Sequence, residues 1–137
     1  MHLEHLNLVV CDLQKTLAFY QAAFPHWRIR SQGESTCHEY KRKWLHFGDD
    51  YRYIASSDHG VESNRDLTSN HVGLAHYAYV TNNIKALISR LEAASYTWSR
   101  PIDSHGVKKN SYYIDPDCFE IEFVEYSSDL PNERNSD

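Results

Sequence analysis

The chain repeats itself at an offset of 71 residues, and this internal duplication constrains its fold more than any other feature. Residues 3–24 (LEHLNLVVCDLQKTLAFYQAAF) align with residues 74–95 (LAHYAYVTNNIKALISRLEAAS), so that His5 falls on His76. Later matches at the same offset are Trp27 with Trp98 and Ser56-Ser57-Asp58 with Ser127-Ser128-Asp129. A long offset kept along the chain indicates two copies of one supersecondary unit. We expect function where the copies meet, because a pocket between pseudo-symmetric halves is lined from both.

Each copy has the pattern of a βαβββ unit. Residues 3–10 alternate in the way that is typical of a strand. Asp12 then caps a helix whose apolar stripe ends at Phe24, before Pro25. The remaining strands of the first copy are expected near residues 26–32, 39–47 and 51–56. The second copy is expected to have a strand at 74–80, a helix capped by Asn82 or Asn83, and strands near 97–102, 111–114 and 119–126.

These patterns predict an α+β protein with two modules. We expect one domain over residues 1–126, in which module one covers 1–57, a polar connection covers 58–70 and module two covers 71–126. Residues 127–137 are polar and are expected to be a mobile or surface-draped tail.

Composition excludes several classes of partner. The net charge of -5 and the absence of a long Lys/Arg stripe do not favour nucleic acid. No apolar run approaches the ~18 residues of a membrane span, and no signal-peptide pattern is present. Cys11, Cys37 and Cys118 are odd in number and far apart, which fits reduced thiols in the cytoplasm. We expect a cytoplasmic protein that binds a small molecule.

Histidines at matching strand positions and a late carboxylate indicate a metal site. His5 and His76 are expected on the concave face of the sheet, opposite the helices. Glu122 alternates onto one face of the last strand with Glu120, which is the second choice if the register slips by two. Two imidazoles and one carboxylate suit Fe(II), Mn(II), Zn(II) or Ni(II) and leave open positions. The alternatives are hydrogen-bonded histidines without metal and an ion pair between Glu122 and Lys or Arg.

The segments EHLNLVVCDLQKTLAFYQAAF and DPDCFEIEF resemble the vicinal-oxygen-chelate superfamily of glyoxalase I, bleomycin-resistance proteins, fosfomycin-resistance enzymes and extradiol dioxygenases. The resemblance implies a glyoxalase-like domain in which two βαβββ modules form an incomplete, barrel-like curved sheet with helices outside, within a homodimer. It also implies one divalent metal ion, bound by His5, His76 and Glu122, that chelates neighbouring oxygens of the substrate as a Lewis acid. By the same pattern, residues 115–117 (Asp-Pro-Asp) form the turn before the last strand.

The chain departs from that pattern at two places. A fourth acidic ligand is common in the first module, but the offset places Tyr51 there, and a shift by the strand period offers Tyr53 or Ala55. We therefore expect three protein ligands. Cys118 replaces a turn glycine, and a positive φ at this position would cost ~1 kcal/mol.

Two further side chains complete the predicted catalytic set with Glu122. One tyrosine on the inner face would donate a hydrogen bond to a developing oxyanion, and Tyr113 is selected from the group Tyr51, Tyr53, Tyr112 and Tyr113. His105, in a glycine-containing loop, is a candidate general base.

Two functions follow from these expectations. The first is a metal-dependent lyase, isomerase, transferase or ring-cleaving oxygenase that acts on a small oxygen-rich substrate. The second is a metal-free protein of the bleomycin-resistance type that sequesters its ligand. Loss of a stoichiometric ion in His5, His76 and Glu122 variants would distinguish the first from the second.

Overall fold

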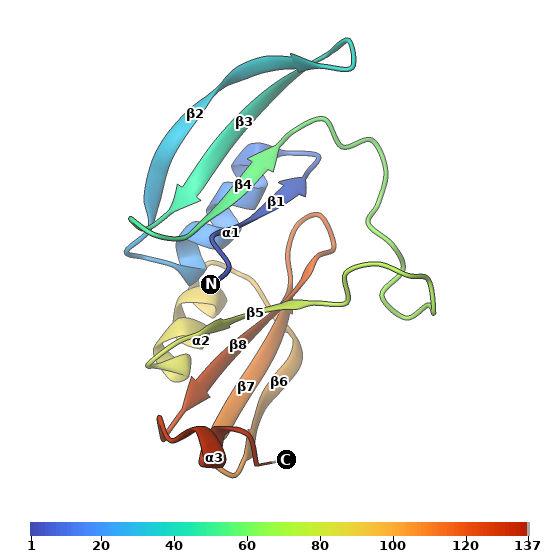
Figure 1. The fold of residues 1–137 in the computed structure, drawn as a ribbon. Coiled ribbons are helices and arrows are strands. Elements are labelled where there is room, and N and C mark those ends of the chain that lie inside the picture. Colours follow the sequence, from blue (N-terminus) through green and yellow to red (C-terminus); the bar gives the residue numbers. More distant parts are fainter. Residues whose placement is uncertain (137) are drawn as a thin grey trace. The chain divides into compact units, whose positions relative to one another are not determined.

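The protein is α+β and consists of two βαβββ units, as the repeat predicts. The computed structural model describes residues 1–136. Its backbone divides into two compact units at the step from Ser63 to Asn64, which lies inside the predicted connection. Each unit has its own four-stranded sheet (Figure 1).

The first unit has its strands in the order β1-β4-β3-β2. Its elements are β1 (His5–Val9), α1 (Leu13–Ala23), β2 (Arg28–Cys37), β3 (Tyr40–Gly48) and β4 (Tyr53–Ser57). Strand β1 is parallel to β4, and the other pairs are antiparallel. Helix α1 covers one face of this sheet (Figure 1), where Leu45, Phe47 and Ile54 are buried. The other face of the sheet carries the alternate residues of each strand.

The second unit has the same topology, with the strand order β5-β8-β7-β6. Its elements are β5 (Tyr77–Val80), α2 (Ile84–Ala93), β6 (Trp98–His105), β7 (Lys108–Ile114) and β8 (Glu120–Tyr126). Ile84, Leu87 and Leu91 of α2 are buried, and the helix contacts β8. Ile121 and Phe123 are completely buried. We call the sheet face opposite the helix the open face of each unit.

Both helices begin at the predicted caps. The Asp12 carboxylate accepts hydrogen bonds from the backbone N–H groups of Gln14 (2.9 Å) and Lys15 (3.1 Å). The Asn83 side chain accepts one from the N–H of Ala86 (2.9 Å). Both contacts satisfy donors that the first helical turn leaves without a partner.

The 71-residue offset does not hold through the last strands. Asn7 pairs with Ala55, and Ala78 pairs with Glu122. Asn7 and Ala78 are 71 residues apart, but Ala55 and Glu122 are 67 apart. The offset shrinks because β2 and β3 have 10 and 9 residues, whereas β6 and β7 have 8 and 7. The predicted equivalence of residues 56–58 with residues 127–129 is therefore wrong.

The C-terminal segment contains a short helix that the sequence analysis did not predict. This helix, α3, spans Pro131–Arg134. The Arg134 guanidinium lies 4.0 Å from the centre of the Tyr126 ring, which holds the segment against the end of β8. The last residue of the predicted tail, Asp137, lies outside the described residues.

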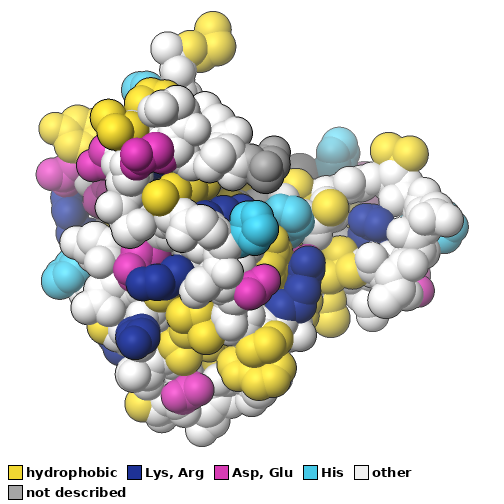
Figure 2. Space-filling model, turned by 90° about the horizontal axis from the view of Figure 1, so that it is seen from below, with side chains coloured by type: hydrophobic (Ala, Val, Ile, Leu, Met, Phe, Trp, Pro, Cys, Tyr) yellow, Lys and Arg dark blue, Asp and Glu magenta, His cyan; other side chains and the backbone are white. Residues whose placement is uncertain are grey.

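On the face that Figure 2 shows, basic and acidic side chains lie scattered among apolar ones. None of the helices within residues 1–136 is long and apolar enough to cross a membrane.

Candidate functional site

Glu122 is a buried carboxylate at the centre of the second sheet. It pairs with Ala78 of β5 and with Tyr112 of β7, and only 5% of its surface is exposed. Its neighbours in sequence, Ile121 and Phe123, belong to the apolar core, so the alternation of β8 places Glu122 on the open face. A buried carboxylate is costly unless it is paired and hydrogen-bonded.

The two oxygens of Glu122 have different partners. Its Oε1 accepts a hydrogen bond from Asn110 Nδ2 (2.8 Å) and lies 3.1 Å from Lys108 Nζ. Its Oε2 lies 3.4 Å from His76 Nε2. Burial by itself raises the pKa of Glu122, but the hydrogen bonds from Asn110 and Lys108 outweigh this effect and hold the pKa below its usual value. The carboxylate is therefore ionised at neutral pH.

His76 and Glu122 fit the geometry of two ligands on one metal ion. Two donor atoms bound at 2.0–2.2 Å to a tetrahedral ion lie about 3.3–3.6 Å apart, and the observed Nε2–Oε2 distance is 3.4 Å. The contacts of Oε1 with Asn110 and Lys108 are of the kind that orient ligand carboxylates from outside a metal site. The pair could therefore hold a divalent ion without disturbing the contacts of Oε1.

Tyr112 is the tyrosine beside this pair. Its ring lies 5.5 Å from the His76 ring, edge to face, and the Arg100 guanidinium lies 3.7 Å from its ring centre. Burial, followed by the charge of Glu122, raises the pKa of Tyr112, so the phenol stays protonated and can donate a hydrogen bond. Arg100 also binds Glu120, with 2.7 Å between Nη2 and Oε2. Glu120 is thus held in an ion pair on the same face.

The structure does not bring Tyr113 and His105 to Glu122. Tyr113 lies on the opposite face of β7, completely buried and 6.1 Å from the Phe123 ring. Burial raises the pKa of its phenol to about 12. His105 is exposed and pairs with Lys108, the first residue of β7. It lies four strand positions from Tyr112, or about 13 Å along the strand.

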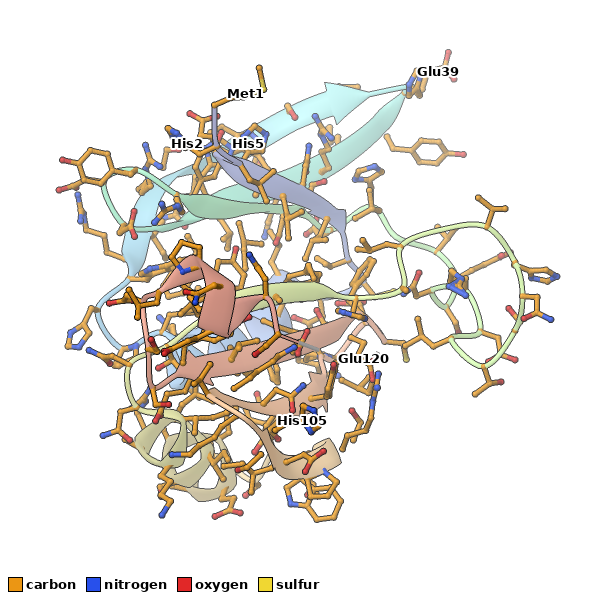
Figure 3. The ribbon with its side chains drawn as sticks, turned by 60° about the horizontal axis from the view of Figure 1, so that its bottom comes forward. Met1, His2, His5, Glu39, His105 and Glu120 are labelled. Atoms are coloured by element: carbon orange, nitrogen blue, oxygen red, sulfur yellow. The ribbon has the colours of Figure 1, made fainter. Side chains whose placement is uncertain are left out.

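His5 belongs to the first unit, at the start of β1 (Figure 3). Its Nδ1 lies 2.9 Å from Glu4 Oε2, and its ring stacks on Tyr53 with 4.6 Å between ring centres. Of the three predicted metal ligands, the structure thus places His76 and Glu122 together. Within residues 1–136, no group of three or more His, Cys, Asp or Glu side chains is arranged to hold a metal ion.

Sequence reasoning missed Lys108 and Asn110. Both lie on β7 with the same alternation as Tyr112, and therefore on the face of Glu122. Beginning this strand at Lys108, rather than at the predicted Ser111, would have identified them. The run Lys108-Lys109-Asn110 hid the strand because it contains no apolar residue.

Comparison with known proteins assigns the chain to a class. Residues 2–123 match the family model of the Glyoxalase/Bleomycin resistance protein/Dioxygenase superfamily. The protein therefore belongs to this superfamily. No curated protein sequence gives a significant match.

Several solved structures share the fold. A glyoxylase/bleomycin resistance protein/dioxygenase domain from Frankia sp. EAN1pec is 18% identical with a TM-score of 0.76, over 99% of this chain and 98% of that one. A glyoxalase family protein from Enterococcus faecalis is 20% identical with a TM-score of 0.71, over 90% and 97%. The fosfomycin resistance protein FosX from Listeria monocytogenes, complexed with Mn(II) and sulfate, is 22% identical with a TM-score of 0.67, over 98% of both chains.

Proposed function

We propose that the protein is a divalent-metal enzyme that acts on a small oxygen-rich substrate, with His76 and Glu122 as two of its metal ligands. The observation that carries the proposal is the 3.4 Å separation of His76 Nε2 and Glu122 Oε2 around a buried, ionised carboxylate. Imidazole and carboxylate donors together suit Fe(II), Mn(II), Zn(II) or Ni(II). The reaction is of the lyase, isomerase, transferase or ring-cleaving oxygenase type.

His5 is the proposed third ligand. His5 is equivalent to His76, because Asn7 of β1 and Ala78 of β5 occupy matching positions and each histidine lies two residues earlier in the chain. His5 begins β1, whereas His76 directly precedes β5. We propose a homodimer as the functional form. Membership of the superfamily supports this form.

The side chains around the pair have separate roles in this proposal. A bound ion would polarise the oxygens of the substrate as a Lewis acid. Lys108 and Asn110 hold the Glu122 carboxylate in place through Oε1. Tyr112, a protonated phenol oriented by Arg100, would donate a hydrogen bond to a substrate oxygen that gains negative charge.

Mn(II) is the first ion to test, because the FosX neighbour from Listeria monocytogenes was crystallised with it. Calorimetric titration of EDTA-treated, untagged protein should give about one Mn(II) site per chain. Substitution of a ligand leaves too few donors, so His76→Ala and Glu122→Gln should each weaken binding at least about tenfold. His5→Ala should do the same if the third ligand is correct.

Glu120→Gln is the matched control for this titration. Glu120 lies on the same strand and the same face but is paired with Arg100, so Mn(II) affinity should stay within about twofold of the wild type. Wild-type Mn(II) affinity in Glu122→Gln, or loss of Mn(II) binding in Glu120→Gln, would contradict the assignment.

A metal-free ligand-binding protein is the second candidate. The observation in its favour is Lys108, whose ammonium lies 3.1 Å from Glu122 Oε1 and neutralises the carboxylate without any ion. This function predicts that the protein stays folded in EDTA and binds its ligand equally well with and without Mn(II). A ligand affinity that rises with Mn(II) would exclude it.

A further inference from the structure

We infer that Arg65, in the connection that leads into β5, is a positioning residue that holds His76 beside Glu122. The inference rests on the proposed function, because Arg65 acts through a proposed metal ligand. All three residues belong to the second unit.

His76 is held less firmly by its strand than its counterpart in the first unit. In the first sheet, His5 is the first residue of β1 and pairs with Tyr53. In the second sheet, the pairing of β5 with β8 begins only at Tyr77, one residue after His76. Residues 71–76 are exposed and belong to no helix or strand. The position of His76 therefore depends on the segment that leads into β5.

The Arg65 guanidinium closes a loop directly before this histidine. Its Nη2 donates a hydrogen bond to the carbonyl oxygen of Ser69 (3.1 Å), and its Nη1 donates one to the carbonyl oxygen of Leu74 (3.5 Å). Gly73 makes room for the arginine, because a Cβ at position 73 would lie 2.7 Å from Arg65 Cδ. Since Leu74 lies two residues before His76, the arginine holds the backbone at the point where the ligand segment begins.

The carbonyl on the other side of the guanidinium belongs to an ordered turn. The Asp66 carboxylate accepts a hydrogen bond from the N–H of Thr68 (2.8 Å), and the Asp66 carbonyl accepts one from the N–H of Ser69 (3.1 Å). Aspartate stabilises turns in this way. Arg65 therefore ties the Leu74 carbonyl to a fixed point and not to a second free segment.

Asn64 ties the start of the connection to the turn before β8. Its Nδ2 donates to the carbonyl oxygen of Cys118 (3.0 Å), and its Oδ1 accepts from the N–H of Arg65 (2.8 Å). Cys118 lies in the turn that leads to Glu122. Asn64 and Arg65 thus connect the segment that ends at His76 with the segment that leads to Glu122.

This connection should matter for the affinity of a metal ion. A histidine on a mobile segment has to be ordered when an ion binds, and ordering costs conformational entropy. Because Arg65 orders the segment when the protein folds, less of this cost remains for the binding step. Loss of Arg65 should therefore weaken metal binding although no ligand is removed.

Nuclear magnetic resonance of the metal-free protein in EDTA tests the positioning. The rings of His76 and Tyr112 lie 5.5 Å apart, so the wild type should show nuclear Overhauser effects between their ring protons. Arg65→Ala should reduce these effects at least about twofold. The backbone order parameters of residues 71–75 should fall towards the ~0.6 of a flexible chain.

Calorimetric titration with Mn(II) tests the consequence for the proposed site. Arg65→Ala should weaken Mn(II) binding about five- to tenfold. The double variant of Arg65→Ala and His76→Ala should bind Mn(II) no more weakly than His76→Ala alone, because Arg65 acts through that histidine.

Arg134→Ala is the matched control. Arg134 belongs to the same unit, but its guanidinium contacts Tyr126. Its removal should leave the order parameters of residues 71–75 unchanged and Mn(II) affinity within about twofold of the wild type. Overhauser effects between the rings of Tyr113 and Phe123, 6.1 Å apart in the core, show whether each variant is folded.

Wild-type order parameters and ring contacts in Arg65→Ala would overturn the inference, whether or not the protein binds Mn(II). Absence of the contact between His76 and Tyr112 from the wild type, or additive losses in the double variant, would also overturn it. A wild type that binds no Mn(II) would instead contradict the proposed function. In that case, loss of the ring contact in Arg65→Ala would still support the positioning of His76 by Arg65.

Discussion

Cys118 adopts a backbone conformation that L-amino acids rarely take, and the turn around it leads directly to the site. Its φ is 66°, the positive value that the sequence analysis considered for this position. Asp115 closes the turn by accepting hydrogen bonds from the N–H groups of Asp117 and Phe119, both at 2.9 Å. The turn starts β8 in the register that places Glu122 beside His76.

Replacing Cys118 with glycine should stabilise the protein. The left-handed conformation costs a side-chain-bearing residue about 1–2 kcal/mol, and the greater freedom of glycine in the unfolded chain offsets part of this gain. We expect Cys118→Gly to raise the free energy of unfolding by about 0.5–1 kcal/mol, measured by urea denaturation under reducing conditions.

Cys118→Ala is the control for that measurement, because it removes the thiol and keeps the strained φ. It should be no more stable than the wild type. Equal stability of the glycine and alanine variants would mean that the backbone strain is absent.

At the same scale, the sequence selected His76 and Glu122, which the structure places together, but not the side chains around them. Alternation along β8 placed Glu122 on a face, and the repeat selected His76. Alternation also places Tyr112 and Tyr113 on opposite faces of β7. Their sequence does not say which of the two lies on the face of Glu122. The side chains that satisfy Glu122 come from a different strand, and their contacts depend on a register that residue patterns leave open.

At the scale of elements, the helix caps are the most local features and were predicted best. Asp12→Ala should lower the free energy of unfolding by about 1 kcal/mol, because two N–H groups lose their acceptor. Chemical denaturation measures the loss.

Asp12→Asn separates the hydrogen bond from the charge. Asparagine keeps an acceptor at the cap, so the expected loss is smaller than that of Asp12→Ala. If both substitutions cost the same, the interaction of the charge with the helix dipole, and not the cap hydrogen bond, would be the source of the stability.

The elements whose bounds or existence the sequence did not predict are those without an apolar pattern. Strand β6 is exposed along its whole length and contains Pro101, so no alternation marks its end at His105. Its pairing with β7 also shifts register twice. Helix α3 has no buried residue, and only Pro131 at its first position indicates a helix start.

At the scale of the whole molecule, the duplication predicted the topology, but it did not predict which side chains each copy carries at matching positions of its sheet. The repeat gave two βαβββ units, which the structure confirms. A constant offset made Tyr51 the equivalent of Glu122 in the first unit, whereas the strand pairing shows that the equivalent residue is Ala55. Strand lengths differ between the copies, and this difference could not be read from their low sequence identity. At this position the second unit has a buried carboxylate and the first unit has the methyl group of Ala55.

The metal content of untagged protein, measured by inductively coupled plasma mass spectrometry after purification without chelators, tests the metal-enzyme proposal most directly. We predict about one Mn, Fe, Zn or Ni ion per chain in the wild type and in Glu120→Gln. Glu122→Gln and His76→Ala should each retain less than about a tenth of that amount. A folded wild type without such an ion, or a Glu122→Gln variant that keeps it, would contradict the proposal.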